Sequence, residues 1–150
     1  MVAAPPPQPN FGSAASFALF TTTEAVGNTG ISNITGNIGT NSGAITGFGT
    51  STVTGSIYNN NSITAQCATD LETAYNQISS FTPTAAHDAV FGNGEKLDAG
   101  VYSLGSAGSA AGVLTLDAQG NSSALFIFQI DGAFNTGAGT TVVLVNGPVA

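Results

Sequence analysis

The segment from Ser32 to Asn61 reads SNITGNIGTNSGAITGFGTSTVTGSIYNNN and contains no acidic or basic residue. Single branched aliphatic residues alternate in it with small polar residues, and Ile34-Thr-Gly-Asn-Ile38 recurs nineteen residues later as Val53-Thr-Gly-Ser-Ile57. This alternation predicts short strands with one apolar and one polar face. Glycine after each run favours turns and close approach of neighbouring backbones. A period near twenty residues with glycine-rich corners predicts an uneven β-solenoid, in which each coil buries its apolar face against its neighbours.

The segment 62–80 departs from this alternation. Apolar residues recur there at the three- and four-residue spacing of one helical face: Ile63, Cys67, Leu71, Ala74, Tyr75 and Ile78. The spacing predicts one amphipathic helix that lies along the coils, with Asn61 or Ser62 as its N-cap and Asp70 on its polar face. Cys67 is then a small buried hydrophobic residue rather than a reactive thiol.

Strand patterns return after a loop that contains His87, which we expect to be exposed. The expected strands span residues 100–104, 112–117, 124–130 and 140–145. The last two are nearly continuous apolar runs, as strands covered on both faces are, so they are predicted to lie in the middle of the structure.

Composition restricts the function. The chain has 150 residues, enough for one domain, but only 6% of them are charged and the net charge is −7, with Lys96 as the only cation. Hydroxyls and amides take the place of charge, since there are 19 Thr and 13 Asn. Phosphate binding needs cationic side chains, so nucleic acid and anionic membranes are excluded as partners. A single cysteine allows no intrachain disulfide and no cysteine metal cluster.

Residues 1–10 are expected to form a flexible proline-rich lead. They carry no basic residue and no apolar run, so they are neither a signal peptide nor the start of a transmembrane segment. No apolar run elsewhere in the chain is long enough to span a bilayer.

From about Phe11 to Ala150 the chain resembles the microbial ice-binding protein family. Several blocks in the same order carry the resemblance: Phe17-Ala-Leu-Phe20, Ile34-Thr-Gly, Val53-Thr-Gly, Ala65-Gln66, Asp70-Leu71, Thr73-Ala-Tyr-Asn76, Gly100-Val-Tyr102, Leu114-Thr-Leu-Asp-Ala-Gln-Gly120, Phe126-Ile-Phe-Gln-Ile130 and Val142-Val-Leu-Val-Asn-Gly147. The resemblance implies a mostly β fold over residues 11–150, an irregular right-handed parallel β-helix with one long α-helix, about residues 62–80, packed alongside.

Members of that family continue past the Val142–Gly147 stretch through further strands, which this chain lacks. The chain is then a fragment or a naturally short form, and an open stack end exposes strand edges and apolar side chains. We expect self-association through this open C-terminal solenoid end. The resemblance also implies an extracellular protein of a cold-exposed microbe, with the native signal peptide absent from this chain.

Ice presents a neutral repeating lattice, so a surface that binds it should be flat, rigid and uncharged. Threonine offers a methyl group and a hydroxyl on a side chain whose χ1 is restricted. The resemblance places the ice-binding face among outward residues at matching points of successive coils, and we predict the set Thr21, Thr23, Thr40, Ser42, Thr50 and Thr52. Thr35 and Thr54 share another strand position and are expected on a different side. Asn28, Asn33 and Asn37 are expected to be turn or ladder residues.

The expected activity is inhibition of ice growth and recrystallisation by a protein that is not an enzyme, with no catalytic residue, cofactor or metal site. Catalytic β-helices need clustered carboxylates, whereas Asp88, Glu95, Asp98, Asp117 and Asp131 are scattered and His87 is the sole histidine. The alternative is a secreted or cell-surface adhesin or a carbohydrate-binding solenoid. Sugar binding favours exposed aromatic platforms. The chain has no Trp, and Tyr58 and Tyr102 are expected to be packed.

Overall fold

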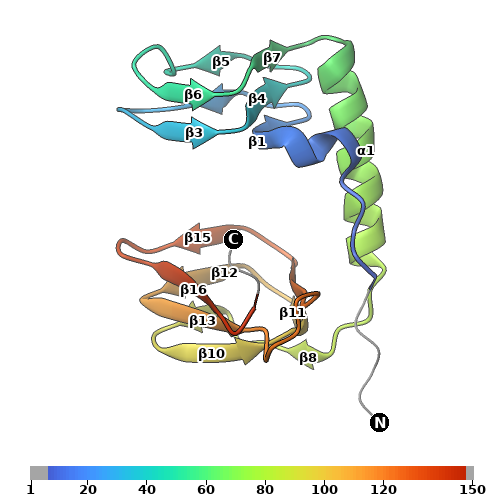
Figure 1. Cartoon of the computed structure of the whole chain (residues 1–150), viewed down its shortest axis with the longest axis vertical. Coiled ribbons are helices and arrows are strands. Elements are labelled where there is room, and N and C mark those ends of the chain that lie inside the picture. The colour runs from blue at the N-terminus through green and yellow to red at the C-terminus, as the bar shows by residue number, and fades with distance from the viewer. Residues whose placement is uncertain (1–6, 148–150) are drawn as a thin grey trace. The chain divides into compact units, whose positions relative to one another are not determined.

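The computed structural model of the chain describes residues 7–147, so residues 1–6 of the predicted lead lie outside the described residues. The chain divides into two compact units (Figure 1). We call residues 9–77 the N-terminal unit and the part from residue 78 onward the C-terminal unit. Both consist of short parallel strands stacked in coils, which confirms the predicted β-solenoid architecture.

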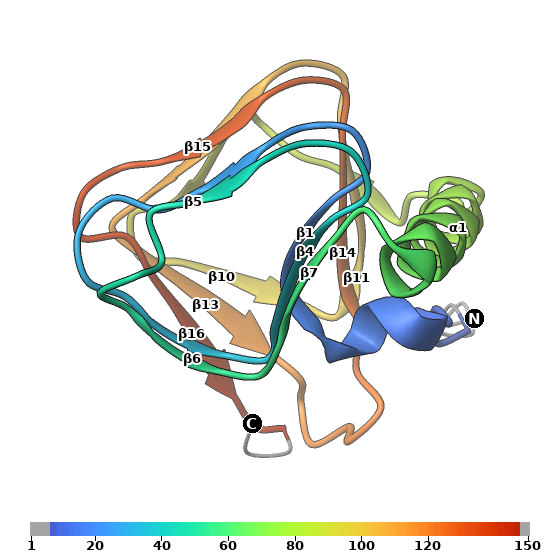
Figure 2. The same ribbon diagram turned by 90° about the horizontal axis from the view of Figure 1, so that it is seen from above.

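The N-terminal unit begins with the short 3₁₀-helix η1 (Gly12–Ser16). Its strands then form three parallel sheets that make three sides of each coil, as Figure 2 shows from above. The sheets are β1 (Phe17–Thr21) with β4 (Asn37–Thr40) and β7 (Ile57–Asn59), β2 (Val26–Gly27) with β5 (Ile45–Thr46), and β3 (Asn33–Thr35) with β6 (Thr52–Thr54).

The stacking of these coils decides which apolar residues are buried. Ile38 pairs in register with Leu19 on one side and Ile57 on the other. Ile38 is fully buried, whereas Leu19 is 40% and Ile57 49% exposed. The apolar residues of a coil are therefore fully buried only where the coil has a neighbour on both sides. This is expected of a solenoid, in which each repeat contacts only its neighbours.

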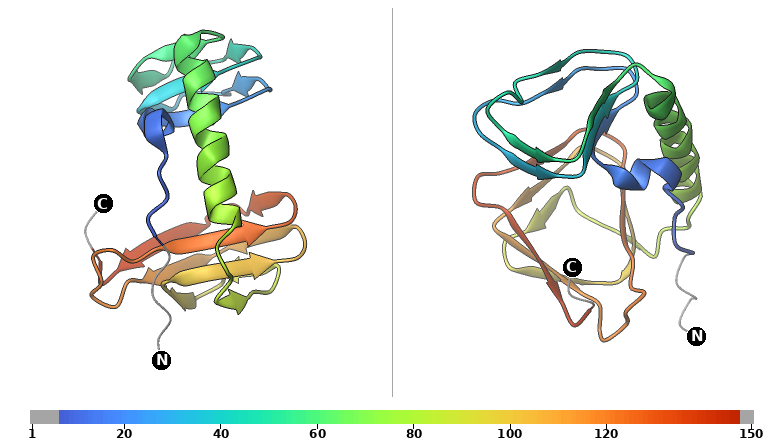
Figure 3. Two further views of the ribbon diagram at one scale, coloured as in Figure 1. Left: turned by 90° about the vertical axis from the view of Figure 1, so that its right-hand side faces the viewer. Right: turned by 45° about the horizontal axis from the view of Figure 1, so that its top comes forward.

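Helix α1 spans Ser62–Ser79, close to the predicted 62–80, and Asn61 is its N-cap. The side-chain oxygen of Asn61 accepts hydrogen bonds from the backbone N–H groups of Ile63 and Thr64. Figure 3 shows α1 as one continuous helix with its first turns beside the coils of the N-terminal unit. Cys67 is fully buried, as predicted, and burial raises the pKa of its thiol.

The buried stripe of α1 differs from the predicted one. Ile63 and Tyr75 are 43% and 68% exposed, so the helix is rotated away from the expected apolar face. Asp70, expected on the polar face, instead accepts hydrogen bonds from the backbone N–H and the hydroxyl of Ser13, at 2.7 and 2.6 Å. The helix is thus fastened to η1 by a carboxylate, which apolar periodicity does not reveal.

The C-terminal unit has the same construction, with three strands in each of three parallel sheets. The sheets are β8 (Ala85–Ala86) with β11 (Gly100–Leu104) and β14 (Phe126–Ile130), β9 (Val90–Gly92) with β12 (Gly108–Ala111) and β15 (Phe134–Thr136), and β10 (Glu95–Asp98) with β13 (Val113–Asp117) and β16 (Thr141–Val145). The Gln129 side-chain amide donates to the carbonyls of Ile78 and Phe81, which joins the end of α1 to β14.

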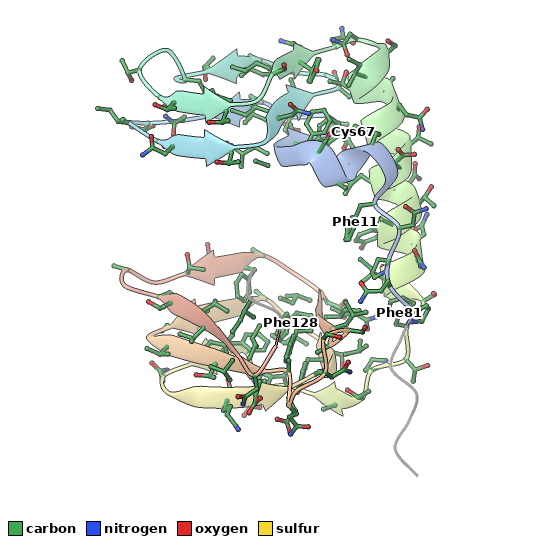
Figure 4. The ribbon with its side chains drawn as sticks, in the orientation of Figure 1. Phe11, Cys67, Phe81 and Phe128 are labelled. Atoms are coloured by element: carbon green, nitrogen blue, oxygen red, sulfur yellow. The ribbon has the colours of Figure 1, made fainter. Side chains whose placement is uncertain are left out.

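The core of this unit is a cluster of Phe91, Leu104, Ala110, Leu114 and Leu116. Partly buried hydrophobic residues pack against it, among them Phe128, which points into the coil interior (Figure 4).

The last coil of the C-terminal unit corrects one prediction. Strands β14 and β16 were expected in the middle of the structure, but each pairs with one strand only and lies at the edge of its sheet. Val142 and Leu144 are in register with the buried Leu114 and Leu116, yet they are 55% and 57% exposed. They face the coil interior, but among the described residues no further coil covers them.

Lys96 joins two coils of this unit. Its ammonium lies 2.6 Å from Oδ2 of the buried Asp117, and the Asn146 amide donates to Oδ1 of the same carboxylate at 2.8 Å. These hydrogen bonds and one from the Gln119 backbone lower the pKa of Asp117 to about 2. The only lysine of the chain is thus engaged with a carboxylate whose lowered pKa favours the ionised form.

Replacing Leu116 and Leu144 by alanine tests this account of coil stacking. The two leucines are register partners, 8% and 57% exposed. We expect Leu116→Ala to lower the free energy of unfolding of the C-terminal unit by about 2–5 kcal/mol, because it leaves a cavity. Leu144→Ala, the matched control, should cost about 1 kcal/mol or less, since half its surface is already in water. Urea titration followed by the amide NMR signals of β13 measures both, and equal losses would refute the account.

Candidate functional site

The polar face of the β3–β6 sheet presents paired residues to solvent at regular positions. Asn33 pairs with Thr52 and Thr35 with Thr54, and all four side chains are exposed. The residues between them, Ile34 and Val53, are half-buried on the opposite face. We call the set Asn33, Thr35, Thr52 and Thr54 the threonine face.

Strand geometry gives this face a fixed spacing. Neighbouring strands lie about 4.8 Å apart, and residues two positions apart in one strand are about 6.6 Å apart. The four side chains therefore stand at the corners of a small repeating grid. Because threonine is restricted at χ1, three of the four positions hold their methyl and hydroxyl groups in few orientations.

Backbone hydrogen bonds hold the two strands together beyond their ends. Thr52 N–H donates to the Ser32 carbonyl, and Gly36 N–H donates to the Thr54 carbonyl. Just past the threonine face, a Cβ on Gly55 would collide with the carbonyl oxygen of Gly36. Glycine is therefore required there for close approach of the two coils, and this explains why Thr-Gly recurs in the sequence.

A network of hydrogen bonds between small polar side chains joins the two coils at the turns that precede β3 and β6. The Asn28 amide donates to the carbonyls of Gly30 and Gly47 and to the Ser51 hydroxyl, at 2.9–3.0 Å. The Ser32 hydroxyl donates in turn to Asn28 Oδ1 at 2.7 Å. Asn28 is thus the turn and ladder residue that the sequence predicted. Asn37 has the same role, since it accepts from the Ser56 N–H and donates to the Ser16 hydroxyl.

The six predicted site residues do not form one surface. Thr40 is fully buried, and its hydroxyl donates to the Glu24 carbonyl at 2.8 Å. The expectation that Thr40 points outward is therefore wrong, because the chain turns inward at the end of β4 and uses this hydroxyl to close the turn. Thr21, its register partner, is half-buried, and its hydroxyl accepts from the Glu24 N–H at 3.2 Å.

The remaining four are exposed but lie in two places. Ser42 and Thr23 follow the ends of β4 and β1, and Thr23 lines a groove beside α1. Thr50 and Thr52 lead into and begin β6. Of the six residues, only Thr52 belongs to the threonine face.

The three other residues of the threonine face were not in the predicted site. Thr35 and Thr54 were expected on a different side, and Asn33 was expected to be a turn or ladder residue. The signal that identifies them is alternation, because Thr52 and Thr54 are two positions apart in one strand and must share its face. The nineteen-residue repeat then places Asn33 and Thr35 beside them.

Charge is absent from the threonine face and its surroundings in sequence, since Ser32–Asn61 holds no ionisable acid or base. The acids of the N-terminal unit are Glu24, Asp70 and Glu72, and the last two are on α1. Within residues 7–147, no group of three or more His, Cys, Asp and Glu side chains is placed to hold a metal ion. In the same range, no helix has the length and hydropathy needed to cross a membrane.

A groove of about 680 Å³ lies beside α1 in the N-terminal unit. Leu71 and Tyr75 form part of one wall, and Thr23 and Glu72 are among its polar residues. Tyr58 and Tyr102, which the sequence predicted to be packed, are both half-buried. Tyr58 packs against Phe17, and Tyr102 stacks on Phe128 with ring centroids 5.6 Å apart.

Comparison with known proteins gives consistent matches. A family model described as "Ice-binding-like" matches residues 20–150. An "Ice-binding protein" of Nostoc sp. (strain HG1) is 36% identical over 123 residues, which are 81% of this chain and 46% of that protein. The chain therefore spans about half the length of this curated relative.

Two solved structures illustrate the likeness of fold. An ice-binding protein from an Antarctic bacterium of the Flavobacteriaceae superposes with a TM-score of 0.87 at 48% identity, over 92% of this chain and 32% of that one. One from the Antarctic ascomycete Antarctomyces psychrotrophicus gives a TM-score of 0.84 at 31% identity, over 93% of this chain and 69% of that one.

The close approach at Gly55 can be tested by substitution. Gly55→Ala should lower the free energy of unfolding of the N-terminal unit by roughly 1 kcal/mol or more, because β3 and β6 must separate to admit the methyl group. Gly49→Ala is the matched control, since nothing lies within 4 Å of its added Cβ. Urea unfolding of the two variants measures the difference. A Gly55 variant as stable as the Gly49 variant would show that the strands do not need this contact.

Proposed function

This chain belongs to the Ice-binding-like family, and we propose that it adsorbs to ice crystals through the threonine face and so inhibits their growth and recrystallisation. The observation that carries the proposal is the exposed, in-register set of Asn33, Thr35, Thr52 and Thr54 on a sheet without charge. Relatives described as ice-binding proteins, with the same fold, support it.

A protein surface can bind ice when its groups match the lattice and are already held in place before contact. A charged group orders water around itself in a pattern that no crystal plane repeats, whereas hydroxyl, amide and methyl groups at fixed spacing are compatible with a neutral lattice. Each methyl-sized group removed from liquid water contributes about 0.8 kcal/mol, so adsorption depends on many such groups acting together. The rigid sheet keeps the cost of ordering them small.

The residues predicted from the sequence divide accordingly. Thr52 is a member of the proposed surface, and Thr50, exposed just before it, extends the surface. Thr21 ends β1, and Thr23 and Ser42 lie in the turns after β1 and β4. We assign these three residues no part in the threonine face. The ice crystal is the proposed partner. Because ice that meets a cell grows in the surrounding water, we propose that the protein acts after export.

Replacing Thr52 by tyrosine tests the proposed surface. The ring would stand above the grid and keep Thr35 and Thr54 from reaching a flat plane. We expect Thr52→Tyr to reduce ice-growth inhibition at a given concentration about tenfold, equivalent to about 1.4 kcal/mol, with little change in stability because the side chain points outward. Observation of a single crystal in dilute protein, with recrystallisation assays, measures the activity.

Thr73→Tyr is the matched control for this experiment, because it makes the same change at an exposed position of α1. Its activity should equal that of the unmodified chain. Equal activity of the Thr52 and Thr73 variants would remove the threonine face from the proposal. Unaltered crystals together with binding to a sugar array, lost in Tyr75→Ala, would favour the carbohydrate-binding alternative.

We also propose that two copies of the chain associate through the last coil of the C-terminal unit. Within residues 7–147, strands β14, β15 and β16 each pair along one edge only, and none of the three strands carries a charged residue. The coil interior there opens on an apolar cavity of about 280 Å³, lined by Phe91, Leu114, Phe128, Ile130 and Phe134. The free edges of these three strands could each pair with a strand of another coil of the same construction. A second copy of the chain supplies such a coil.

A lysine at an inward position of β16 should prevent this association. Leu144→Lys places a charge among apolar groups at the open end, whereas Val143→Lys, the control, places it on the opposite face of the same strand. Sedimentation equilibrium should show dimers for the unmodified chain and the Val143 variant, and monomers for the Leu144 variant. An unmodified chain that stays monomeric at every accessible concentration would refute the proposed association.

A further inference from the structure

His87 is not the exposed loop residue that the sequence predicted. Its side chain is only 9% exposed, and both ring nitrogens have a hydrogen-bond partner. Nδ1 lies 2.6 Å from the backbone carbonyl oxygen of Asp88, and Nε2 lies 2.8 Å from Oε1 of Glu95. His87 follows β8 and Glu95 begins β10, so this contact closes the first coil of the C-terminal unit around β9.

The two contacts of the His87 ring each require a proton between the paired atoms. A carbonyl oxygen can only accept a hydrogen bond, so Nδ1 must carry a proton. The second contact also needs a proton, either on Nε2 or on the carboxyl group of Glu95. The Gly92 N–H donates to Oε2 of Glu95 at 3.1 Å, which favours the carboxylate, and carboxylic acids give up their protons more readily than imidazolium ions. Both contacts are satisfied together when each ring nitrogen carries a proton, which is the imidazolium form.

We propose that His87 is a buried imidazolium ion that fastens the first coil of the C-terminal unit, and that this coil loosens when rising pH removes the proton. A neutral ring that still donates from Nδ1 to the Asp88 carbonyl has no proton on Nε2. The lone pair of Nε2 then faces the Glu95 carboxylate. Two acceptors at hydrogen-bond distance repel each other, so one of the contacts must open. The proposal is independent of ice binding.

The packing around the ring connects this contact to the core. The His87 ring stacks on Phe91, with ring centroids 3.9 Å apart and planes 13° apart. The Tyr102 ring lies nearly perpendicular to the His87 ring, with the two centroids 6.1 Å apart. Phe91 is 1% exposed and belongs to the core cluster. Movement of the His87 ring therefore removes one of the contacts that hold β9 in place.

The groups that act on His87 set the direction of its pH response. Burial by itself lowers the pKa of His87, but the hydrogen bonds to Asp88 and Glu95 and the negative charges of both residues outweigh it, so the pKa is raised above 6.5. Across the coil, β9 presents the uncharged Phe91, and β11 presents Tyr102, whose pKa is raised by burial and by Asp98 and Glu95. The nearby Lys96 is engaged with Asp117.

The sign of the effect follows from the raised pKa. In the unfolded chain His87 titrates near its ordinary value, and in the folded chain it titrates higher. The folded state then binds the proton more tightly, so the contribution to stability is complete below about pH 6.5 and is lost as the pH rises through the folded pKa. A histidine that is buried in its neutral form acts in the opposite direction, because it destabilises the fold when falling pH protonates it.

Ring ¹⁵N NMR of the full chain tests the protonation state directly, because His87 is the only histidine and gives one set of signals. At pH 6.5 a free imidazole is about half protonated. We expect the folded chain to be more than half protonated there, with both nitrogens at imidazolium shifts, and the urea-unfolded chain to titrate near 6.5. A folded His87 that titrates at or below 6.5, or one neutral tautomer at acidic pH, overturns the proposal.

The coupling to the coil is tested with Glu95→Gln and a matched control, Asp131→Asn, which removes one charge from an exposed residue of the same unit. We expect the urea midpoint of the C-terminal unit and the exchange protection of the Gly92 amide to fall between pH 6 and pH 9 in the unmodified chain and in Asp131→Asn. Both should depend less on pH in Glu95→Gln. The same pH profile in all three proteins overturns the proposal. If Glu95→Gln does not fold, the ¹⁵N titration of the unmodified chain decides.

Discussion

Parallel pairing between successive coils is the constraint on which this structure depends. Each side of a coil has only two to five paired residues, so a single coil cannot cover its own interior. Residues at the same register position of successive coils therefore differ in burial. Ile38 is fully buried, whereas its partners Leu19 and Ile57 are about half exposed. The same difference separates Leu116 from Leu144 in the C-terminal unit. Stability in both units comes from stacking, not from the composition of any one strand.

Stacking also produces the proposed functional surface. When two coils pair in register, residues nineteen positions apart lie side by side, and polar residues at alternate positions of each strand form a grid on the solvent face. Glycines such as Gly55 allow the backbones to approach, and Asn28 joins the corner of one coil to the next. The absence of charge from Ser32–Asn61 leaves this grid neutral. The proposed ice contact is therefore a product of the repeat itself.

The solenoid, its uneven period and the helix at 62–79 could be predicted, because alternation and helical spacing are local properties of the sequence. The repeat is nineteen residues from Ile34 to Val53 but twenty-eight from Leu114 to Val142. What the sequence could not show depends on three-dimensional context. Thr40 is a strand residue like Thr52, but its hydroxyl is used inside a turn. Likewise, β16 has the apolar pattern of a covered strand but lies at the edge of its sheet. The side chain of His87 contacts the carboxylate of Glu95, eight residues away, and is therefore not exposed.

The most direct test of the central claim is transfer of proton polarisation from ice to the methyl groups of ¹³C-labelled threonines in a frozen solution of the chain. We predict strong transfer to Thr35, Thr52 and Thr54, and weak transfer to the exposed Thr69 and Thr73 of α1. Such a pattern would place the β3–β6 sheet against the crystal. Equal transfer to the sheet and the helix, or transfer to the helix alone, would contradict the account.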